Sequence, residues 1–167
     1  MKNKLGFTLI ELLIVIAVMA ILTTVVFVAL NPLARFQDSR NSKRSSDVEA
    51  IIGAIKINQV DNGGYYLQAI EDAGADLAYQ IGTGSSCDEP CLYPAVALEA
   101  DCVDLAELVT KGTLPKYPFD PQATGASAEH SKYYLIKNSN GSITVGSCAE
   151  EKGSTSGATP AEISVTR

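Results

Sequence analysis

The longest apolar segment of the chain lies near its start and reaches from Leu5 to Leu30. An α-helix rises about 1.5 Å per residue, so a helix over this segment would be roughly 39 Å long, more than the ~30 Å hydrocarbon core of a bilayer. The pattern therefore predicts a membrane-spanning helix. Its one charged residue is Glu11. A carboxylate inside a bilayer costs on the order of 3 kcal/mol, which makes Glu11 a candidate functional residue.

The apolar run ends at Asn31-Pro32. Proline has no backbone N–H and disfavours α geometry at the residue before it, so we expect a kink, or the end of the membrane helix, at Pro32. Apolar positions then return at helical spacing and predict that residues 33–61 continue as an amphipathic helix able to cover a sheet. This stripe consists of Val48, Ile51, Ile52, Ile55 and Gln59. The glycines of Asp61-Asn62-Gly63-Gly64 are expected to end the helix.

Two short segments near residue 140 predict a β-hairpin. Residues 132–137 and 142–148 are rich in β-branched and aromatic residues, and Asn140-Gly141 between them supplies the positive φ angles of a tight turn. Upstream, residues 101–111 are expected to form a helix that Gly112 ends. Together with the long helix, these segments predict an α+β fold in which the helix packs on a small antiparallel sheet.

The rest of the chain after the long helix gives a weaker pattern. Residues 68–80 are compatible with a short helix broken at Gly74, and residues 92–98 with a strand that Pro94 confines to an edge or a bulge. Residues 149–167 contain few large apolar side chains, so we expect a flexible C-terminal tail.

Composition narrows the class of protein. The formal net charge is −6, and an acidic chain is a poor general nucleic-acid binder because phosphate contacts need Lys and Arg. We therefore expect no direct nucleic-acid binding. Four cysteines without zinc-type C-x₂-C pairs, downstream of a membrane segment, indicate disulfides formed in an oxidising compartment. Residues after about 31 are accordingly expected outside the cytoplasm.

The four cysteines allow three disulfide pairings. We expect Cys102–Cys148, because Cys102 precedes the predicted helix and Cys148 ends the last predicted strand, with Cys87–Cys91 closing a small loop. No histidine has the spacing of a metal ligand relative to these cysteines, so no metal is expected.

The chain shows no residue pattern typical of a catalytic site. His130 is the only histidine and lies in a polar stretch beside Glu129, without a Ser or Cys nucleophile motif. A glycine-rich nucleotide loop is also missing from the sequence. We therefore expect a protein that is not an enzyme and that holds no cofactor.

Two ordinary explanations of the N-terminal segment compete with a functional one. A cleaved secretory signal has an apolar region of about 7–15 residues ending at an A-x-A-like site. The apolar run here is longer and does not end at such a site. A plain membrane anchor explains the length and the basic flank of Lys2 and Lys4 but leaves Glu11 unexplained.

The stretch Lys4-Leu5-Gly6-Phe7-Thr8-Leu9-Ile10-Glu11-Leu12 resembles the class III signal of type IV pilins and of the pseudopilins of secretion and DNA-uptake machines. The resemblance implies cleavage between Gly6 and Phe7 by a prepilin peptidase, N-methylation of Phe7, and a glutamate, Glu11, at the fifth mature position. By the same resemblance, the Glu11 carboxylate pairs with the Phe7 α-amine of a neighbouring subunit. Because both charges are costly to bury alone, such a pair would fix the axial register.

The resemblance divides the chain into five parts. They are a leader at 1–6, a transmembrane and filament-core helix at 7–31, its extracytoplasmic continuation at 32–62, a globular head at 63–148 and the flexible tail at 149–167. Loss of the leader removes two lysines and takes the formal net charge from −6 to −8. The polar stretch 35–47 is then either a solvated stalk or a surface facing neighbouring subunits.

Charge alone leaves the orientation in the membrane almost tied, because four basic residues between 35 and 44 oppose Lys2 and Lys4. The peptidase motif and the cysteines favour a cytoplasmic N-terminus and a head outside the cytoplasmic membrane. The implied partners are further copies of the chain in a filament, membrane lipid, the prepilin peptidase and N-methyltransferase, and an inner-membrane assembly platform with its ATPase.

Three functions remain open. The first is the major pilin of a type IV pilus, stored in the membrane, cleaved, methylated and polymerised through its N-terminal helix. The second is a pseudopilin of a type II secretion or competence system. In some major pseudopilins a calcium loop is present, to which Asp120 and Glu129 could contribute, although the glycine- and aspartate-rich loop of those proteins is not visible here. The third is a membrane-tethered binding or sensor domain.

Overall fold

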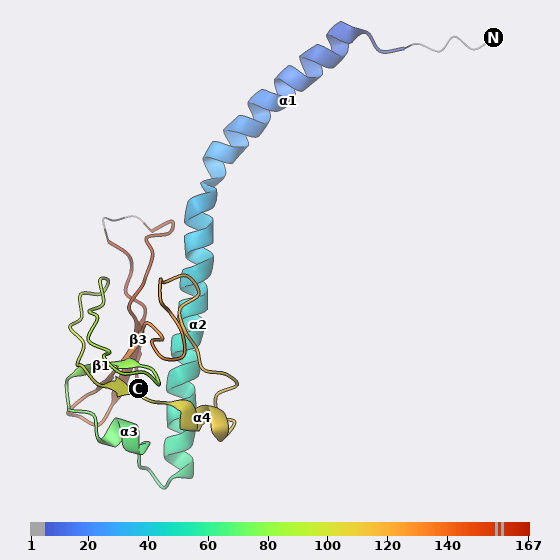
Figure 1. Cartoon of the computed structure of the whole chain (residues 1–167). Helices are drawn as coiled ribbons and strands as arrows, with labels where there is room; N and C mark the ends of the chain where they lie inside the picture. The colour runs from blue at the N-terminus through green and yellow to red at the C-terminus, as the bar shows by residue number, and fades with distance from the viewer. Residues whose placement is uncertain (1–5, 156, 158) are drawn as a thin grey trace.

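The computed structural model describes residues 6–155, 157 and 159–167. A long helical segment projects from a small head with its N-terminal half and runs along that head with its C-terminal half (Figure 1). Of the leader expected at 1–6, residues 1–5 lie outside the described residues, and Lys2 and Lys4 with them.

The long helical segment consists of two helices that meet at Asn31. Helix α1 spans Leu9–Leu30 and helix α2 spans Pro32–Asp61. Asn31 has a left-handed conformation, with φ 40° and ψ 70°, and Pro32 is the first residue of α2, where a missing N–H costs least. The chain bends here (Figure 1), at the residue pair where the sequence predicts a kink. Helix α2 covers the predicted amphipathic segment.

The head is built on a sheet of five strands in the order β2-β1-β3-β4-β5. The strands are β1 Ala78–Ile81, β2 Cys102–Val103, β3 Tyr133–Lys137, β4 Ile143–Ser147 and β5 Ser164–Thr166. Strands β1 and β2 run parallel, and the other neighbouring pairs are antiparallel. The expected α+β fold is confirmed, except that the sheet is mixed rather than wholly antiparallel.

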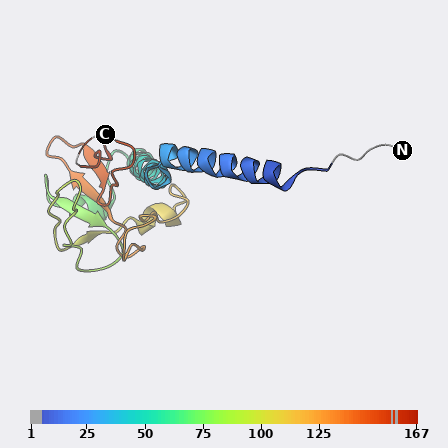
Figure 2. The same ribbon diagram turned by 90° about the horizontal axis from the view of Figure 1, so that it is seen from above.

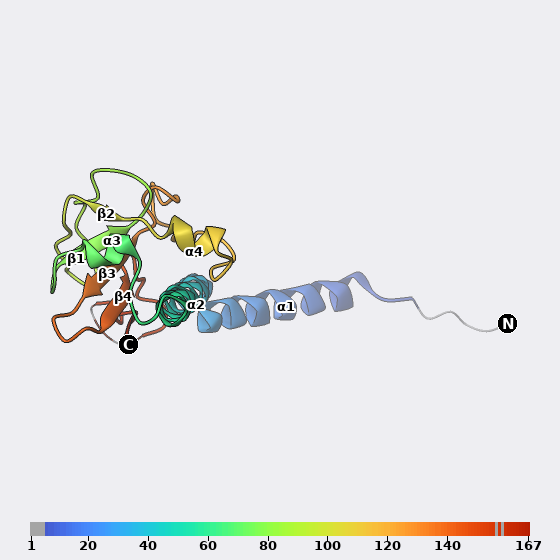
Figure 3. The same cartoon turned by 90° about the horizontal axis from the view of Figure 1, so that it is seen from below.

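One face of the sheet packs against α2. The predicted stripe of α2 is buried from Val48 to Ile55 and joins alternate strand residues in one hydrophobic core. The sheet contributes Ile81, Val103, Tyr133, Leu135, Ile143 and Val145. Views from above and from below place the strands together on one side of α2, with α1 directed away from them (Figure 2, Figure 3). The apolar stripe of α2, which repeats every 3.6 residues, therefore packs against strand side chains that repeat every two residues.

The opposite face of the sheet is covered by the loop between β1 and β2. Tyr134 and Ala78 form a second apolar cluster there with Cys91, Leu98 and Cys148. The Tyr134 ring lies against Gly146 of the neighbouring strand, where any Cβ would overlap it. This position therefore requires glycine.

Two disulfides tie the covering loop to the sheet, Cys87–Cys102 and Cys91–Cys148. The expected pairing of Cys102 with Cys148 and of Cys87 with Cys91 is wrong. Cys102 lies in β2, and Cys148 follows β4, with β1 and β3 between them in the sheet. Three strand spacings amount to about 14 Å, which exceeds the ~7 Å that a disulfide can span between Cα atoms.

Three other segments differ from the expectations. In the range 101–111, residues 102–103 form β2 and only Ala106–Thr110 form a helix, α4. The range 68–80 divides into helix α3, Gln68–Glu71, and strand β1. Residues 92–98 form turns instead of a strand, with two isolated bridges, from Tyr93 to Ala149 and from Val96 to Cys91. Strand β2 exists through its pairing with β1, a tertiary contact that local patterns do not reveal.

The predicted hairpin of β3 and β4 is confirmed, with Gly141 of its turn at φ 84°. The C-terminal residues, in contrast, pack on the head instead of forming the flexible tail expected at 149–167. Strand β5 adds to β4, with Val165 opposite Val145. Ahead of β5, the chain is bound to α2 by polar contacts. The pattern of apolar residues along the sequence cannot predict such contacts.

Candidate assembly site

Helix α1 is exposed along its whole length, from Leu9 to Leu30. The helical segment Leu9–Asp61 is long and apolar enough to cross a membrane, with a mean hydropathy of 3.0 in its most apolar window. Large apolar side chains of α1 point in every direction around the helix, and none is covered by the head. Such a surface is unfavourable in water, so lipid or other helices must cover it.

Thr8 and Glu11 form a capping box at the start of α1. Glu11 Oε2 accepts the Thr8 N–H at 2.9 Å and the Thr8 hydroxyl at 2.8 Å, and Thr8 Oγ1 accepts the Glu11 N–H at 3.3 Å. These bonds satisfy backbone donors that the first helical turn leaves open. Glu11, which a plain anchor leaves unexplained, therefore has a defined orientation in the structure.

Glu11 still has one carboxylate oxygen to offer. Within the described residues, Oε1 makes no hydrogen bond, and none joins Glu11 to Phe7. Phe7 is 93% exposed. The carboxylate is the only charge on α1, so wherever α1 is buried in an apolar medium this charge needs a partner from outside its own chain.

The face of α2 that points away from the sheet is partly apolar as well. Leu33 and Phe36 at one end, and Ile57 and Val60 at the other, are more than half exposed. Ile57 and Val60 line a shallow open groove. The exposed surface of α1 thus extends onto the outer face of α2.

The polar stretch 35–47 contains a buried residue, Arg44. The sequence predicts for this stretch either a solvated stalk or a surface facing neighbouring subunits, and neither includes a buried charge. Arg44 is 1% exposed. Its Nε and Nη2 donate to Asp120 Oδ2 at 2.6 Å and Oδ1 at 3.1 Å, and its Nη1 donates to Glu151 Oε2 at 2.9 Å. Asp120 Oδ1 also accepts two backbone N–H groups of the following turn. The Asp120 carboxylate is thus fully used in the fold, and Glu129, its expected companion in a calcium loop, is exposed.

The segment 150–154 is held against α2 by a set of polar contacts, which we call the C-terminal clamp. Arg40 donates to both oxygens of Glu151 at 2.5 Å, and Asn41 bonds both the C=O and the N–H of Glu151. The N–H groups of Gly153 and Ser154 donate to Gln37 and Asp38. The hydrogen bond from Arg40 lowers the pKa of Glu151 below its usual range, which keeps the clamp charged at neutral pH.

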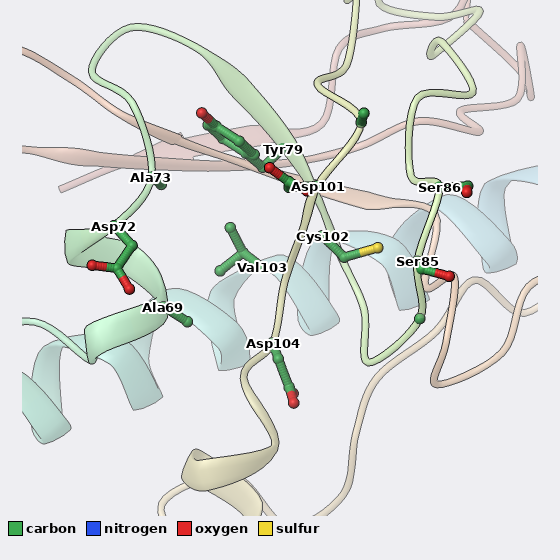
Figure 4. A pocket seen from close by; sticks show the side chains of 12 residues that line it. Ala69, Asp72, Ala73, Tyr79, Ser85, Ser86, Asp101, Cys102, Val103 and Asp104 are labelled. Carbon is green, nitrogen blue, oxygen red and sulfur yellow. The ribbon is translucent and has the colours of Figure 1, made fainter.

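A cavity of about 430 Å³ in the head is open to solvent and lies beside strands β1 and β2 (Figure 4). Its polar groups are hydroxyls and carboxylates from Tyr79, Ser85, Ser86, Asp72, Asp101 and Asp104. Among the described residues, its lining contains no histidine, lysine or arginine, so it offers no imidazole base and no cation for charge stabilisation.

His130 lies outside this cavity, next to the disulfide of Cys87 and Cys102. No local pattern predicts this contact, since His130 is 43 residues from Cys87. Arg44 and Asp120 are likewise 76 residues apart. Such groups meet only through the fold.

Residues 1–27 match the family model of the prokaryotic N-terminal methylation motif. This motif is the class III signal of type IV pilins and pseudopilins, so the resemblance found in the sequence is confirmed for this part of the chain. Searches of curated proteins and of solved structures gave no match to this chain.

The match supports a pilin-like or pseudopilin protein and indicates a structural protein. It also implies processing by a prepilin peptidase and assembly into a filament. The apolar N-terminal helix is consistent with the membrane anchoring of such proteins.

Proposed function

We propose that this chain is the major structural subunit of a type IV pilus, that it has no enzymatic activity, and that it polymerises through α1. The observation that carries the proposal is the fully exposed apolar helix with a single, locally oriented carboxylate at its start. In the membrane, lipid covers this helix. In a filament, the α1 helices of other subunits take the place of lipid.

The exchange of lipid for neighbouring helices explains why a charge is useful here. Lipid tails are as apolar as the side chains of α1, so bundling gains little from the hydrophobic effect and depends on packing and polar contacts. Apolar packing alone permits many axial positions. A polar pair permits one, because every other position leaves two charges without partners in an apolar medium.

The second member of this pair is the α-amine of Phe7. Cleavage after Gly6 creates it, N-methylation keeps it basic, and an α-amine is largely protonated at neutral pH. Thr8 holds Glu11 Oε2, which leaves Oε1 for the amine of a neighbouring subunit. The leader therefore prevents assembly until the peptidase removes it, since an uncut chain lacks the amine at residue 7.

The membrane-stored form would have its N-terminus in the cytoplasm and its head outside, where the two disulfides form. An assembly platform with its ATPase would supply the energy for extraction. The buried pair of Arg44 and Asp120 favours a pilin over a calcium-dependent pseudopilin, since the Asp120 carboxylate is committed to the guanidinium group and to backbone N–H groups.

The proposal is tested by Glu11→Val in cells that produce the filament. We expect the variant to be inserted and cleaved like the wild type, but surface filaments to fall at least tenfold, because the neighbouring amine loses its partner. Sheared filaments are quantified by immunoblot and electron microscopy, and membrane and processed fractions are measured in parallel.

Thr23→Val is the matched control. It also removes a polar side chain from α1, but the Thr23 hydroxyl bonds only to the C=O of Met19 in its own helix, so filament yield should stay normal. Normal filaments with Glu11→Val, or an equal loss with Thr23→Val, would contradict the pairing.

A further inference from the structure

Four side chains with metal-binding atoms come together at the outer face of the sheet. Cys87, Cys102 and His130 place their ligand atoms within 4.8 Å of one another, and Gln80 contacts His130. We propose that, when the Cys87–Cys102 disulfide is reduced, these groups bind a thiophilic divalent cation of the Zn²⁺ type. Thiolates and one imidazole are the ligands that such ions prefer.

The distances fit tetrahedral coordination. With Zn–S near 2.3 Å and Zn–N near 2.0–2.1 Å, neighbouring S and N ligands lie about 3.6 Å apart, and neighbouring N and O ligands about 3.4 Å apart. Cys87 Sγ lies 3.6 Å from His130 Nδ1, and Gln80 Oε1 lies 3.2 Å from the same nitrogen. The two sulfurs must move apart, from bonded contact to about 3.8 Å.

The four residues come from separate parts of the fold that already hold them. Gln80 of β1 and Cys102 of β2 are directly paired in the sheet. Cys102 directs its sulfur toward the segment of Ser85 and Ser86, which leads to Cys87 (Figure 4). His130 precedes Ser131, whose N–H and hydroxyl both bond the C=O of Ile81. Opening the disulfide therefore leaves Gln80, Cys102 and His130 fixed by β1, β2 and these hydrogen bonds. Cys87 keeps the hydrogen bond from its N–H to the C=O of Ala100.

Two of the four side chains are fully buried, and one of these two has a polar atom without a hydrogen-bond partner among the described residues. Cys87 is 0% exposed and Gln80 is 1% exposed. Gln80 Nε2 is buried and has no hydrogen-bond partner in the described part of the chain. The atom that would coordinate the ion is Gln80 Oε1, which faces His130 Nδ1 at 3.2 Å.

The chemistry balances with a dithiol as reductant. The dithiol gives two electrons and two protons to the disulfide and itself becomes a disulfide, leaving the Cys87 and Cys102 thiols. The metal ion then displaces both thiol protons to the solvent. His130 binds through the lone pair of Nδ1, with its proton on Nε2. Because a chain is synthesised with free thiols, the same site also exists until an oxidant closes Cys87 and Cys102.

The other disulfide provides an internal control. Cys91 and Cys148 share no cluster of three ligand side chains in the described residues. A chain with Cys91→Ser and Cys148→Ser keeps the proposed site and has no other thiols when reduced. A chain with Cys87→Ser and Cys102→Ser keeps two thiols but lacks the site.

The test is titration of the full chain in detergent with Co²⁺, before and after reduction by a dithiol that is then removed. The Cys91→Ser, Cys148→Ser chain should develop thiolate-to-cobalt charge-transfer and tetrahedral d–d absorption with one ion per chain, and Zn²⁺ should displace the Co²⁺. The oxidised chain should show neither band. His130→Phe in the same background should weaken Co²⁺ binding at least tenfold.

Thermal unfolding of each reduced chain with and without Zn²⁺ is a second measurement. It compares each variant with itself, so it is informative even where a variant is less stable than the wild type. Zn²⁺ should raise the unfolding midpoint of the chain with the site, should raise that of the His130→Phe chain by less, and should leave the midpoint of the Cys87→Ser, Cys102→Ser chain unchanged. Absence of the bands in the reduced chain, bands of equal strength with His130→Phe, or equal bands in the chain without Cys87 and Cys102 would overturn the proposal.

Discussion

Arg44 is the residue at which the polar contacts of the head converge. Its guanidinium group is buried and joins α2, the turn at Asp120 and the C-terminal clamp. A buried ion pair adds little net stability compared with an apolar pair of the same shape. Losing one partner is different, because the remaining charge stays buried without compensation.

Asp120→Asn should therefore lower the free energy of unfolding by about 3–5 kcal/mol. The measurement is urea unfolding of the full chain in detergent, followed by circular dichroism. Glu107→Gln is the control, since Glu107 pairs with Lys111 at an exposed site, and such pairs contribute less than about 1 kcal/mol. A loss below about 1 kcal/mol for Asp120→Asn would contradict this expectation. It would show that water or Glu151 takes the place of Asp120 beside the Arg44 guanidinium group.

The buried carboxyl group of Glu150 makes the free energy of unfolding depend on pH. Burial raises its pKa to about 7, although its Oε1 accepts the N–H of Ile163. The charged groups facing it are Arg44 and Glu162. Between the ordinary pKa of 4.5 and about 7, the folded state holds a proton that the unfolded state has lost, so stability falls as pH rises through this window.

Glu150→Gln should remove this loss. Since one unit of pKa shift corresponds to about 1.4 kcal/mol, we expect the variant to exceed the wild type by about 1–3 kcal/mol at pH 8 and to match it more closely toward pH 5. Urea unfolding at pH 5, 6, 7 and 8 measures the difference. Glu99→Gln, which changes an exposed carboxylate, should keep the slope of the wild type, and an unchanged slope in Glu150→Gln would refute the assignment.

At the scale of elements, local periodicity was sufficient for helix α2 and for the hairpin of β3 and β4. The stripe from Val48 to Ile55 has the helical period, and Asn140-Gly141 has the chemistry of its turn. The capping box of Thr8 and Glu11 also has a sequence signature, since threonine is followed by glutamate three residues later.

The elements that escaped prediction depend on distant partners. Strand β2 has two residues and exists through β1. Strand β5 pairs with β4, and the segment ahead of it is anchored to α2 by polar contacts. The disulfide pairing follows from strand order, which the cysteine spacing does not contain. His130 meets Cys87 for the same reason, so metal ligands were not expected there.

The C-terminal clamp determines whether the last segment behaves as a tail. Glu151→Ala removes the partner of Arg40 and one partner of Arg44, and should raise hydrogen–deuterium exchange in residues 150–154 and in β5. We expect unfolding free energy to fall by about 1–3 kcal/mol, mainly because Nη1 of the buried Arg44 loses one of its acceptors. Lys152→Ala, at an exposed position in the same segment, should leave exchange unchanged. Equal exchange in the two variants would contradict the role of the clamp.

At the scale of the whole molecule, the structure separates two tasks. Helix α1 projects away from the head and presents a mainly apolar surface with Glu11 as its one charge, while α2, the sheet and two disulfides form the folded head (Figure 1). The bend at Asn31 and Pro32 divides the two parts. An exposed helix attached to a disulfide-linked head is suited to storage in a membrane and to burial in a polymer.

The most direct test is electron microscopy of filaments sheared from the cell surface, with mass spectrometry of the N-terminus of their subunit. The account predicts thin filaments composed mainly of this chain, beginning at an N-methylated Phe7. In cells that lack the prepilin peptidase, the chain should stay in the membrane with residues 1–6 attached. A chain that keeps its leader in normal cells, or that is absent from the filaments, would contradict the account.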